Sequence, residues 1–562
     1  MSTNVRAYRA THAHDEALRS VLPELRRHAS AGGGRDAAEL EALARTVHLP
    51  VSAVRAALSS FTHAEPSHGE VHVCAGTSCM LAGGGAMSRE LSARCECRPV
   101  YCLGYCDRSP AAMTASGRVV PELTPHRFDD VVADRAVSHP APPSIRCAAS
   151  RAIVTARIAH EGFVDGPPPP YEGLAAALRT TPEATIAEIL ASGERGRGGA
   201  AFPTGNKLKL AAQAPGTPKF IVANGDEGDP GSFIDRELME RDPHAILEGM
   251  AICAHATGAE RGVVFIRSEY PIAADVMERA IRRASEAGLL GDGALGRGRP
   301  FHVEVVCGMG SYVCGEETAL LSAIEGQRGE VWPRPPYPVS EGLFGKPTVV
   351  SNVETLANLP WIMRHGAAAF AAMGTPESRG TKAICLNRGF ARPGIVEVDF
   401  GISLREVIDR LGGGGADGAE LEAVLIGGPM GSIVTPDEWD VPVCFTAMAK
   451  RGINLGHGGL VAIPKPADWR AILRHLLTFM RDESCGKCVP CRLGSARAHE
   501  LATSGISEGT LPEIDRILAL MREASLCAFG RETVGPVKTI LTKFLDRVVA
   551  DGTNGAAKEV RR

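Results

Sequence analysis

The sequence predicts a multidomain α/β protein with helical regions at both ends. With 562 residues, the chain is longer than one hydrophobic core usually supports, so several domains are expected. Hydrophobic residues make up 44% and charged residues 22% of it, which is typical of folded globular proteins. Apolar residues at helical spacing dominate both ends, whereas helix-like and strand-like segments alternate between them.

The changes in this pattern predict where the domains begin and end. Leu40, Leu43 and Val47 follow helical spacing before Pro50 interrupts it, and the last hundred residues show the same periodicity. The expected parts are a helical bundle at 1–65, a compact α/β domain at 66–145, a larger α/β domain at 146–366, a small α+β domain at 367–460 and a C-terminal helical bundle at 461–562.

Charge and hydropathy exclude some classes of partner. The net charge of −4 and the absence of a long basic run make nucleic acid an unexpected partner. No run of apolar residues reaches the roughly 18 that a transmembrane helix needs, and residues 1–20 lack the apolar core of a secretory signal. We therefore expect no direct membrane insertion and a cytoplasmic location. Disulfides are rare there, so the sixteen cysteines are searched first for metal-ligand spacing.

The C-terminal cysteines have the spacing of an iron–sulfur site. Cys485, Cys488 and Cys491 form a C-x2-C-x2-C run, and Cys527 lies in a separate segment. Three thiolates on one short loop plus a fourth from elsewhere suit a [4Fe-4S] cluster. A structural zinc site also takes four cysteines, but zinc ribbons favour two paired arms over three ligands plus a distant one.

A second set, nearer the N-terminus, consists of two pairs, Cys74 with Cys79 and Cys102 with Cys106. Two loops that each give two thiolates suit a two-iron cluster, because each iron takes one pair. A four-cysteine zinc site remains an alternative here. Cys95 and Cys97 lie between the pairs and could compete as ligands.

Residues 193–207 form a glycine-rich segment suited to an anionic ligand. Glycines let the backbone approach a phosphate and direct N–H groups toward it, while Arg197 and Lys207 add positive charge. Phe202 offers a face to an aromatic ring. Such a loop alone is weak evidence, because glycine-rich turns are common.

Two further polar segments strengthen the prediction. Residues 224–231 follow the strand-like run 220–222, so their side chains should lie at the carboxyl end of a strand, where open α/β sheets bind ligands. Residues 310–318 place Glu316 and Glu317 before an apolar helix. A helix N-terminus by itself can explain one of these two carboxylates, but not the whole set of polar loops.

With these motifs in view, the chain resembles the flavoprotein subunit of respiratory complex I and its relatives, the diaphorase subunits of NAD-reducing hydrogenases and the β subunits of NAD-dependent formate dehydrogenases. The resemblance spans 193–530 and is carried by 196–199, 202–205, 224–231, 314–321, 345–350, 352–356 and the C-terminal cysteines. Residues 1–140 resemble the 24-kDa-type subunit of the same complex through both cysteine pairs and 106–110. The resemblance implies a thioredoxin-like domain at 66–145, a Rossmann-like FMN/NADH domain at 146–366 and a ubiquitin-like (SLBB-type) domain at 367–460.

The resemblance also implies the cofactors FMN, NAD(H), [4Fe-4S] and [2Fe-2S], and their ligands. The expected FMN contacts are Gly196, Arg197, Gly198, Lys207, Asn224, Asp226, Glu227, Asn352 and Thr355, with Phe202, Glu316 and Glu317 facing NADH and Gly199, Asp229, Tyr312 and Gly315 also among the cofactor-binding residues. Hydride passes from NADH to FMN, which then releases electrons singly to the clusters. No residue is expected to act as acid or base, although Glu316, Glu317 and Asp229 lie near the reaction. Carboxylates beside the adenosine ribose favour NADH over NADPH.

Departures from the family pattern bear on the partner. Asp229 stands where the complex I subunit usually has Glu, Leu208 where Trp is common, and Ala201 where Gly is common. Fusion of the two modules, together with Asp229, favours a formate dehydrogenase with a molybdenum or tungsten catalytic subunit and a further iron–sulfur subunit. The alternatives are a hydrogenase diaphorase, the complex I flavoprotein, a bifurcating enzyme, and a non-catalytic electron-transfer subunit.

Overall fold

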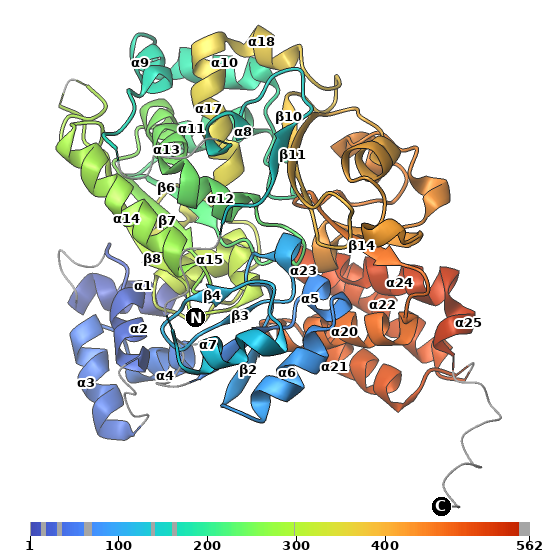
Figure 1. Ribbon diagram of the computed structural model, residues 1–562. Helices are drawn as coiled ribbons and strands as arrows, with labels where there is room; N and C mark the ends of the chain where they lie inside the picture. Colours follow the sequence, from blue (N-terminus) through green and yellow to red (C-terminus); the bar gives the residue numbers. More distant parts are fainter. Residues whose placement is uncertain are drawn as a thin grey trace, which may run out of the picture.

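The structure is a computed structural model that describes residues 2–12, 18–30, 36–60, 70–135, 141–159, 166–296, 298–507 and 509–549 (Figure 1). The expected domain boundary between 65 and 66 lies outside these residues. Among them, the architecture is a mixed α/β fold with three sheets and flanking helices. No helix in the described ranges is both long and apolar enough to cross a membrane.

The central sheet is entirely parallel, with the strand order β8-β7-β6-β9. Its strands are β6 (Phe220–Gly225), β7 (Arg261–Ile266), β8 (His302–Cys307) and β9 (Thr348–Asn352). The helices of this region are α8 (Thr155–Ile158), α9 (Glu172–Leu178), α10 (Pro182–Ser192), α11 (Thr204–Gln213), α12 (Ile234–Arg241), α13 (Pro243–Thr257), α14 (Pro271–Glu286), α15 (Glu317–Ile324), α16 (Pro338–Glu341), α17 (Val353–His365) and α18 (Ala367–Ala371). Alternate residues of β6 face opposite layers, as a parallel sheet covered on both faces requires. Ile221 packs with α13 and α17, and Val222 packs in the other core.

That other core contains the N-terminal helices. These are α1 (Ser2–His12), α2 (Leu22–Ser30), α3 (Ala37–Val47) and α4 (Val51–Ser60), shown in dark blue in Figure 1. Leu22, Leu40 and Val54 are buried in the same cluster as Phe220 and Phe265 of the central sheet. The predicted bundle therefore covers one face of the central sheet, an arrangement that its helical spacing could not indicate.

The first cysteine set lies in a small sheet of order β2-β1-β3-β4, in which β1 and β2 run parallel. Its elements are β1 (Val71–Cys74), α5 (Thr77–Leu81), α6 (Gly84–Ser92), β2 (Cys97–Val100), β3 (Ala112–Met113), β4 (Val119–Val120) and α7 (Phe128–Val132). In Figure 1 this region, in light blue, lies between the N-terminal helices and the red C-terminal helices.

A six-stranded sheet of order β13-β12-β14-β10-β11-β5 joins the remaining parts. Its strands are β5 (Ile145–Cys147), β10 (Thr381–Leu386), β11 (Gly394–Asp399), β12 (Leu421–Ile426), β13 (Ser432–Val434) and β14 (Gly459–Pro464), with α19 (Phe445–Ala449) and a π-helix at Glu406–Leu411 beside them. The edge strand β5 crosses the expected boundary at 145/146, and β14 crosses the one at 460/461.

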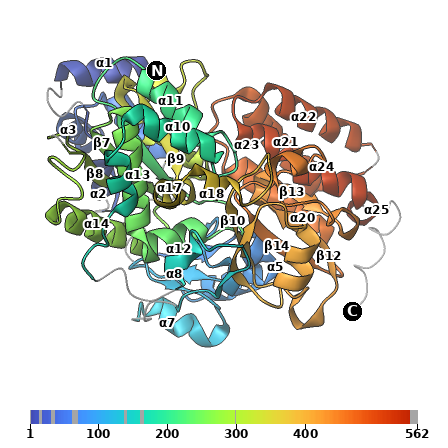
Figure 2. The same ribbon diagram turned by 90° about the horizontal axis from the view of Figure 1, so that it is seen from above.

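The C-terminal helices pack on one face of this sheet. They are α20 (Trp469–Asp482), α21 (Val489–Ser504), α22 (Leu511–Ala524), α23 (Ala528–Glu532), α24 (Val534–Lys543) and α25 (Leu545–Val548). Leu425 and Val461 of the sheet share a buried cluster with Leu476 and Leu518 of the helices. Figure 2 shows α5 of the small first sheet beside β14 and α20, where Thr77 Oγ1 lies 3.1 Å from His475 Nε2.

Candidate functional site

The predicted flavin loops meet at the carboxyl edge of the central sheet. Asn224 is the second-last residue of β6, Asn352 is the last residue of β9, and the two are direct neighbours in the strand register. The Asn224 side chain donates to the Gly315 carbonyl at 2.8 Å, and a Cβ on Gly315 would lie 3.2 Å from the Asp226 carbonyl. Three polar segments predicted from sequence are thus brought together where a parallel sheet binds ligands.

The glycine-rich loop is held to this edge through its backbone. The Gly196 amide donates to the Phe202 carbonyl, and the Arg197 amide donates to Thr355 Oγ1 at 2.9 Å. A Cβ on Gly198 would lie 3.1 Å from Asn352 Cβ, so the loop and Asn352 are in close contact. Phe202 is 46% exposed and remains available to an aromatic ring.

The side chain of Arg197 differs from the expectation that it offers charge to a ligand. Its guanidinium is fully buried in an ion pair with Glu194 and lies 4.8 Å from the ring centroid of Phe400. Because Glu194 neutralises it, Arg197 presents only backbone to the loop's interior. Of the two predicted cations, Lys207 is the one without an ion pair within this segment, and it donates to the Val350 carbonyl at 2.8 Å.

Glu316 and Glu317 have different environments. Glu316 caps α15, where its carboxylate accepts from the amides of Thr318 and Ala319 at 2.9 and 3.0 Å. The helix-capping explanation is therefore correct for this residue. Glu317 lies 2.7 Å from the Arg334 guanidinium and 4.0 Å from Lys207 Nζ. Glu317 thus lies close to two cations. The sequence pattern did not indicate Arg334 as part of the site.

The segment Asp229 to Gly231 connects the flavin loops to both thiol sets. Tyr312 donates its hydroxyl to Asp229, and its backbone amide donates to Glu483 Oε2 at 2.9 Å. Glu483 precedes the C-terminal cysteine loop by two residues. The Gly231 amide lies 3.2 Å from Cys106 Sγ of the N-terminal set.

Aromatic rings fill the space beside the C-terminal thiols. Phe479 meets Tyr312 and Tyr101 edge-on, with centroids 4.9 and 5.0 Å apart, and Phe529 packs in the same cluster. Tyr101 directly precedes Cys102. An aromatic cluster thus extends from the C-terminal thiols to Tyr101 beside the N-terminal set.

The C-terminal thiols lie where two helices begin. Cys488 and Cys527 precede α21 and α23, and Cys491 lies in the first turn of α21. Burial raises the pKa of the Cys491 thiol to about 12 and that of Cys527 to about 11. Thiols so poorly solvated become thiolates only beside a strong positive charge, which a bound metal centre supplies.

The N-terminal thiols form two close pairs. Cys102 Sγ lies 3.5 Å from Cys106 Sγ, and the neighbouring Cys79 thiol lowers the pKa of Cys74 to about 7. Cys95 Sγ lies 3.6 Å from Cys97 Sγ. Cys95 and Cys97 pack in a hydrophobic cluster that contains neither Cys74 and Cys79 nor Cys102 and Cys106, so they pair with each other instead of competing.

The spacing of both sets argues against a single metal ion. Four thiolates on one zinc lie about 2.3 Å from it and hence roughly 4 Å from one another. Within the described ranges, the only group of three or more His, Cys, Asp or Glu with ligand atoms all within 4.8 Å is Glu227, Asp235 and His457. Neither cysteine set brings three described sulfurs within that limit.

The small domain contributes to the site, which sequence reasoning did not predict. A Cβ on Gly199 would lie 3.4 Å from Gly456, and one on Gly428 would lie 3.1 Å from Asp229 Cβ. His457 lies in the same loop as Gly456. The glycines around His457 are the sequence feature that could have indicated this contribution. His457 follows Glu227 by 230 residues, so no sequence pattern places the two segments together.

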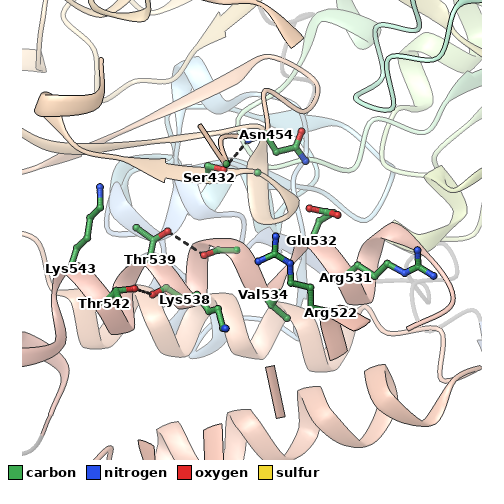
Figure 3. A pocket seen from close by; sticks show the side chains of 13 residues that line it. Ser432, Asn454, Arg522, Arg531, Glu532, Val534, Lys538, Thr539, Thr542 and Lys543 are labelled. Carbon is green, nitrogen blue, oxygen red and sulfur yellow. Dashed lines mark hydrogen bonds between the residues drawn. The ribbon is translucent and has the colours of Figure 1, made fainter. Parts of the chain in front are cut away.

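A separate cavity of about 470 Å³ lies between β13 and helices α22 to α24 (Figure 3). Its described lining is basic and includes Arg522, Arg531, Lys538 and Lys543. None of these residues was predicted to bind a cofactor. Lys543 is paired with Glu438 at 2.6 Å.

Comparison with known proteins agrees with this geometry. Three family models match: the Nuo51 FMN-binding domain at 189–361, the NADH-ubiquinone oxidoreductase-F iron-sulfur binding region at 471–551, and the thioredoxin-like [2Fe-2S] ferredoxin at 7–136. The NADP-reducing hydrogenase subunit HndC of Solidesulfovibrio fructosivorans is 42% identical over 386 residues, which cover 68% of this chain and 78% of that one. The chain belongs to this family of NADH dehydrogenase-type flavin and iron–sulfur subunits.

Hydrogenase and mitochondrial members of the family are also similar to the chain. The α subunit of NAD-reducing hydrogenase HoxS from Cupriavidus necator is 36% identical over 459 residues, covering 79% of this chain and 74% of that one. The mitochondrial NADH-ubiquinone oxidoreductase 51 kDa subunit of Aspergillus niger is 38% identical over 369 residues, covering 64% and 74%. A crystal structure of air-oxidised NAD+-reducing [NiFe]-hydrogenase matches with a TM-score of 0.82 at 28% identity, covering 94% of this chain and 93% of that one.

The family assignment bears directly on the predicted cofactors. The chain carries an FMN-binding domain, a [4Fe-4S] binding region and a thioredoxin-like [2Fe-2S] domain. It is a diaphorase-type subunit of the kind found in hydrogenases and complex I.

Proposed function

We propose that the chain transfers electrons between NAD(H) and a partner dehydrogenase through FMN and both iron–sulfur clusters. The observation that carries this proposal is that the segment from Asp229 to Gly231 is connected to both cysteine sets. Asp229 reaches the [4Fe-4S] loop through Tyr312 and Glu483, and Gly231 touches Cys106. Flavin bound at this edge would lie beside both thiol sets.

The residues that would hold FMN fit it chemically. The glycine-rich loop 196–199 provides backbone N–H groups, Lys207 a cation, and Asn224 and Asn352 amides at one sheet edge. Phe202, Glu316 and Glu317 remain our candidates for NADH, with Arg334 orienting Glu317. When bound, FMN accepts a hydride and releases electrons singly. The protein's own task is to orient the two rings and keep water from the thiol sets.

The [4Fe-4S] ligands in this proposal are Cys485, Cys488, Cys491 and Cys527, and the [2Fe-2S] ligands are Cys74, Cys79, Cys102 and Cys106. Anaerobic purification followed by flavin and iron analysis tests the whole set. About one FMN and about six irons per chain are expected, with NADH bleaching the flavin absorbance. A chain that holds zinc and does not respond to NADH would refute the proposal.

For the partner, we propose the catalytic subunit of a formate dehydrogenase, supported by Asp229. A hydrogenase is the second candidate, since the NAD+-reducing [NiFe]-hydrogenase chain aligns over 94% of this one. Purification of the native complex, followed by NAD+ reduction with formate or with hydrogen, separates them. Activity with hydrogen alone would exclude the formate assignment.

A further inference from the structure

His457 occupies a buried position between two acidic side chains. It lies in the loop before β14 and is 5% exposed. Its Nε2 lies 2.9 Å from Asp235 Oδ2, and its Nδ1 lies 3.5 Å from Glu227 Oε1. Ser232 Oγ also contacts Nδ1. One histidine of the small domain therefore contacts two carboxylates of the flavin domain.

The same group is connected to the predicted flavin contacts. Asn352 Nδ2 donates to Asp235 Oδ2 at 2.6 Å and lies 3.2 Å from His457 Nε2. Asn352 Oδ1 accepts from the backbone amide of Thr355 at 3.4 Å, and Thr355 Oγ1 accepts from the backbone amide of Arg197 in the glycine-rich loop. A chain of contacts thus runs from the imidazole to the loop that we assign to FMN.

The charges around His457 favour its protonated, cationic form. Burial opposes a charged ring, but Asp235 and Glu227 outweigh it and raise the pKa of His457 to about 9. Lys382, the other nearby cation, is occupied by Glu354. Without the imidazolium, two buried carboxylates would face each other, which costs several kcal/mol unless one takes up a proton.

The second residue of the pair also lacks other support. Asp235 Oδ1 is buried and has no hydrogen-bond partner among the residues that the structure describes. Glu227 accepts from the amides of Asp235 and Arg236 at 3.1 and 3.0 Å and from the Tyr270 hydroxyl at 3.3 Å. Asp235 thus depends on His457 and Asn352 for its side-chain contacts, whereas Glu227 has additional donors.

We propose that His457 is a positioning residue of the flavin site, which as an imidazolium bridges Asp235 and Glu227 and so fixes Asn352 against the glycine-rich loop. This inference rests on the proposed function. It makes the small domain a required part of flavin binding and not only a connector to the C-terminal helices.

The test is FMN binding by the full chain, measured from flavin fluorescence on release, at pH 8. His457→Gln removes the cation and leaves both carboxylates, so the FMN dissociation constant should rise at least about tenfold. At pH 6 the loss should be smaller, because a carboxyl group can then take up the missing proton. The double variant His457→Gln/Asp235→Asn restores the charge balance and should return to within about threefold of wild type.

Three outcomes would overturn the proposal: wild-type affinity in His457→Gln at pH 8, a double variant as weak as the single one, or a metal ion beyond the cluster iron that His457→Gln loses. The iron content of each variant verifies its fold. If His457→Gln does not fold, Asp235→Asn is compared with the double variant instead. Equal FMN affinity of these two variants at both pH values supports the charge role of His457. A wild-type chain without FMN would refute the proposed function instead.

Discussion

Replacing Gly104 by alanine should selectively damage the N-terminal cluster site. Gly104 lies between Cys102 and Cys106 with φ of +76°, and an added Cβ would lie 2.7 Å from the Tyr270 hydroxyl oxygen and 2.8 Å from its ring. Tyr270 is 1% exposed and cannot move into solvent. The positive φ costs about 1 kcal/mol, and overpacking adds about 1–3 kcal/mol. We expect a total destabilisation of about 2–4 kcal/mol at the contact between the cysteine loop and the flavin domain.

Gly83→Ala provides the matched control. Gly83 has φ of +82° in the same domain, but its added Cβ would meet nothing within 4 Å. It therefore carries the backbone cost without the clash. Electron paramagnetic resonance of the reduced protein should show the [2Fe-2S] signal weakened in Gly104→Ala and retained in Gly83→Ala. Equal signals and equal melting temperatures in the two variants would refute the close packing of this loop on Tyr270.

Four other predictions concern a cluster ligand, a buried ion pair, His457 and Glu317. Cys527→Ser should reduce iron from about six to about two per chain while the [2Fe-2S] signal persists. Lys382→Met breaks a buried ion pair with Glu354 and should cost about 3–5 kcal/mol in urea unfolding, most of which Lys382→Met/Glu354→Gln should recover. The pKa of His457 in the folded protein, about 9, exceeds its ordinary value of 6.5. Protonated His457 therefore contributes fully to the free energy of unfolding below pH 6.5, and this contribution is lost as the pH rises to about 9. In His457→Gln this fall should move to lower pH, because Glu227, whose pKa burial and Asp235 raise to about 7, then takes up the proton in place of the imidazole. Glu317→Gln should raise the KM for NADH and lower the preference over NADPH, and an unchanged ratio of kcat/KM for the two would contradict its role.

The parts of the site that the sequence predicted are those encoded by short spacing or by strand position. The run from Cys485 to Cys491 specifies three thiolates on one loop, because few backbone paths connect such close ligands. Asn224 and Asn352 are far apart in sequence, but each lies at the carboxyl end of a strand. Parallel strands bring their carboxyl ends to one edge, so the meeting of these loops followed from the pattern.

What could not be predicted depends on contacts between domains. Charge alone suggested that Arg197 faces a ligand, yet the adjacent Glu194 and the distant ring of Phe400 bury its guanidinium. The pairing of Glu317 with Arg334 depends on the path of the proline-rich loop that carries Arg334, and the sequence does not predict that path. Helical spacing in the first sixty residues showed that an apolar face exists but not which surface covers it. Such choices depend on shape complementarity between whole elements, which no local pattern encodes.

The covered face of the central sheet explains why the N-terminal module is more than an added electron carrier. Phe220 and Phe265 point toward α2 to α4 and are at most 2% exposed. A parallel sheet needs apolar layers on both faces, and here the N-terminal helices provide part of one layer, while the cysteine loop of the same module reaches Gly231 beside the flavin segment. The module therefore supports the sheet from one face and reaches its functional edge with another part. Its covalent attachment keeps both contacts at high effective concentration, so formation of the flavin site and docking of the [2Fe-2S] domain are physically linked.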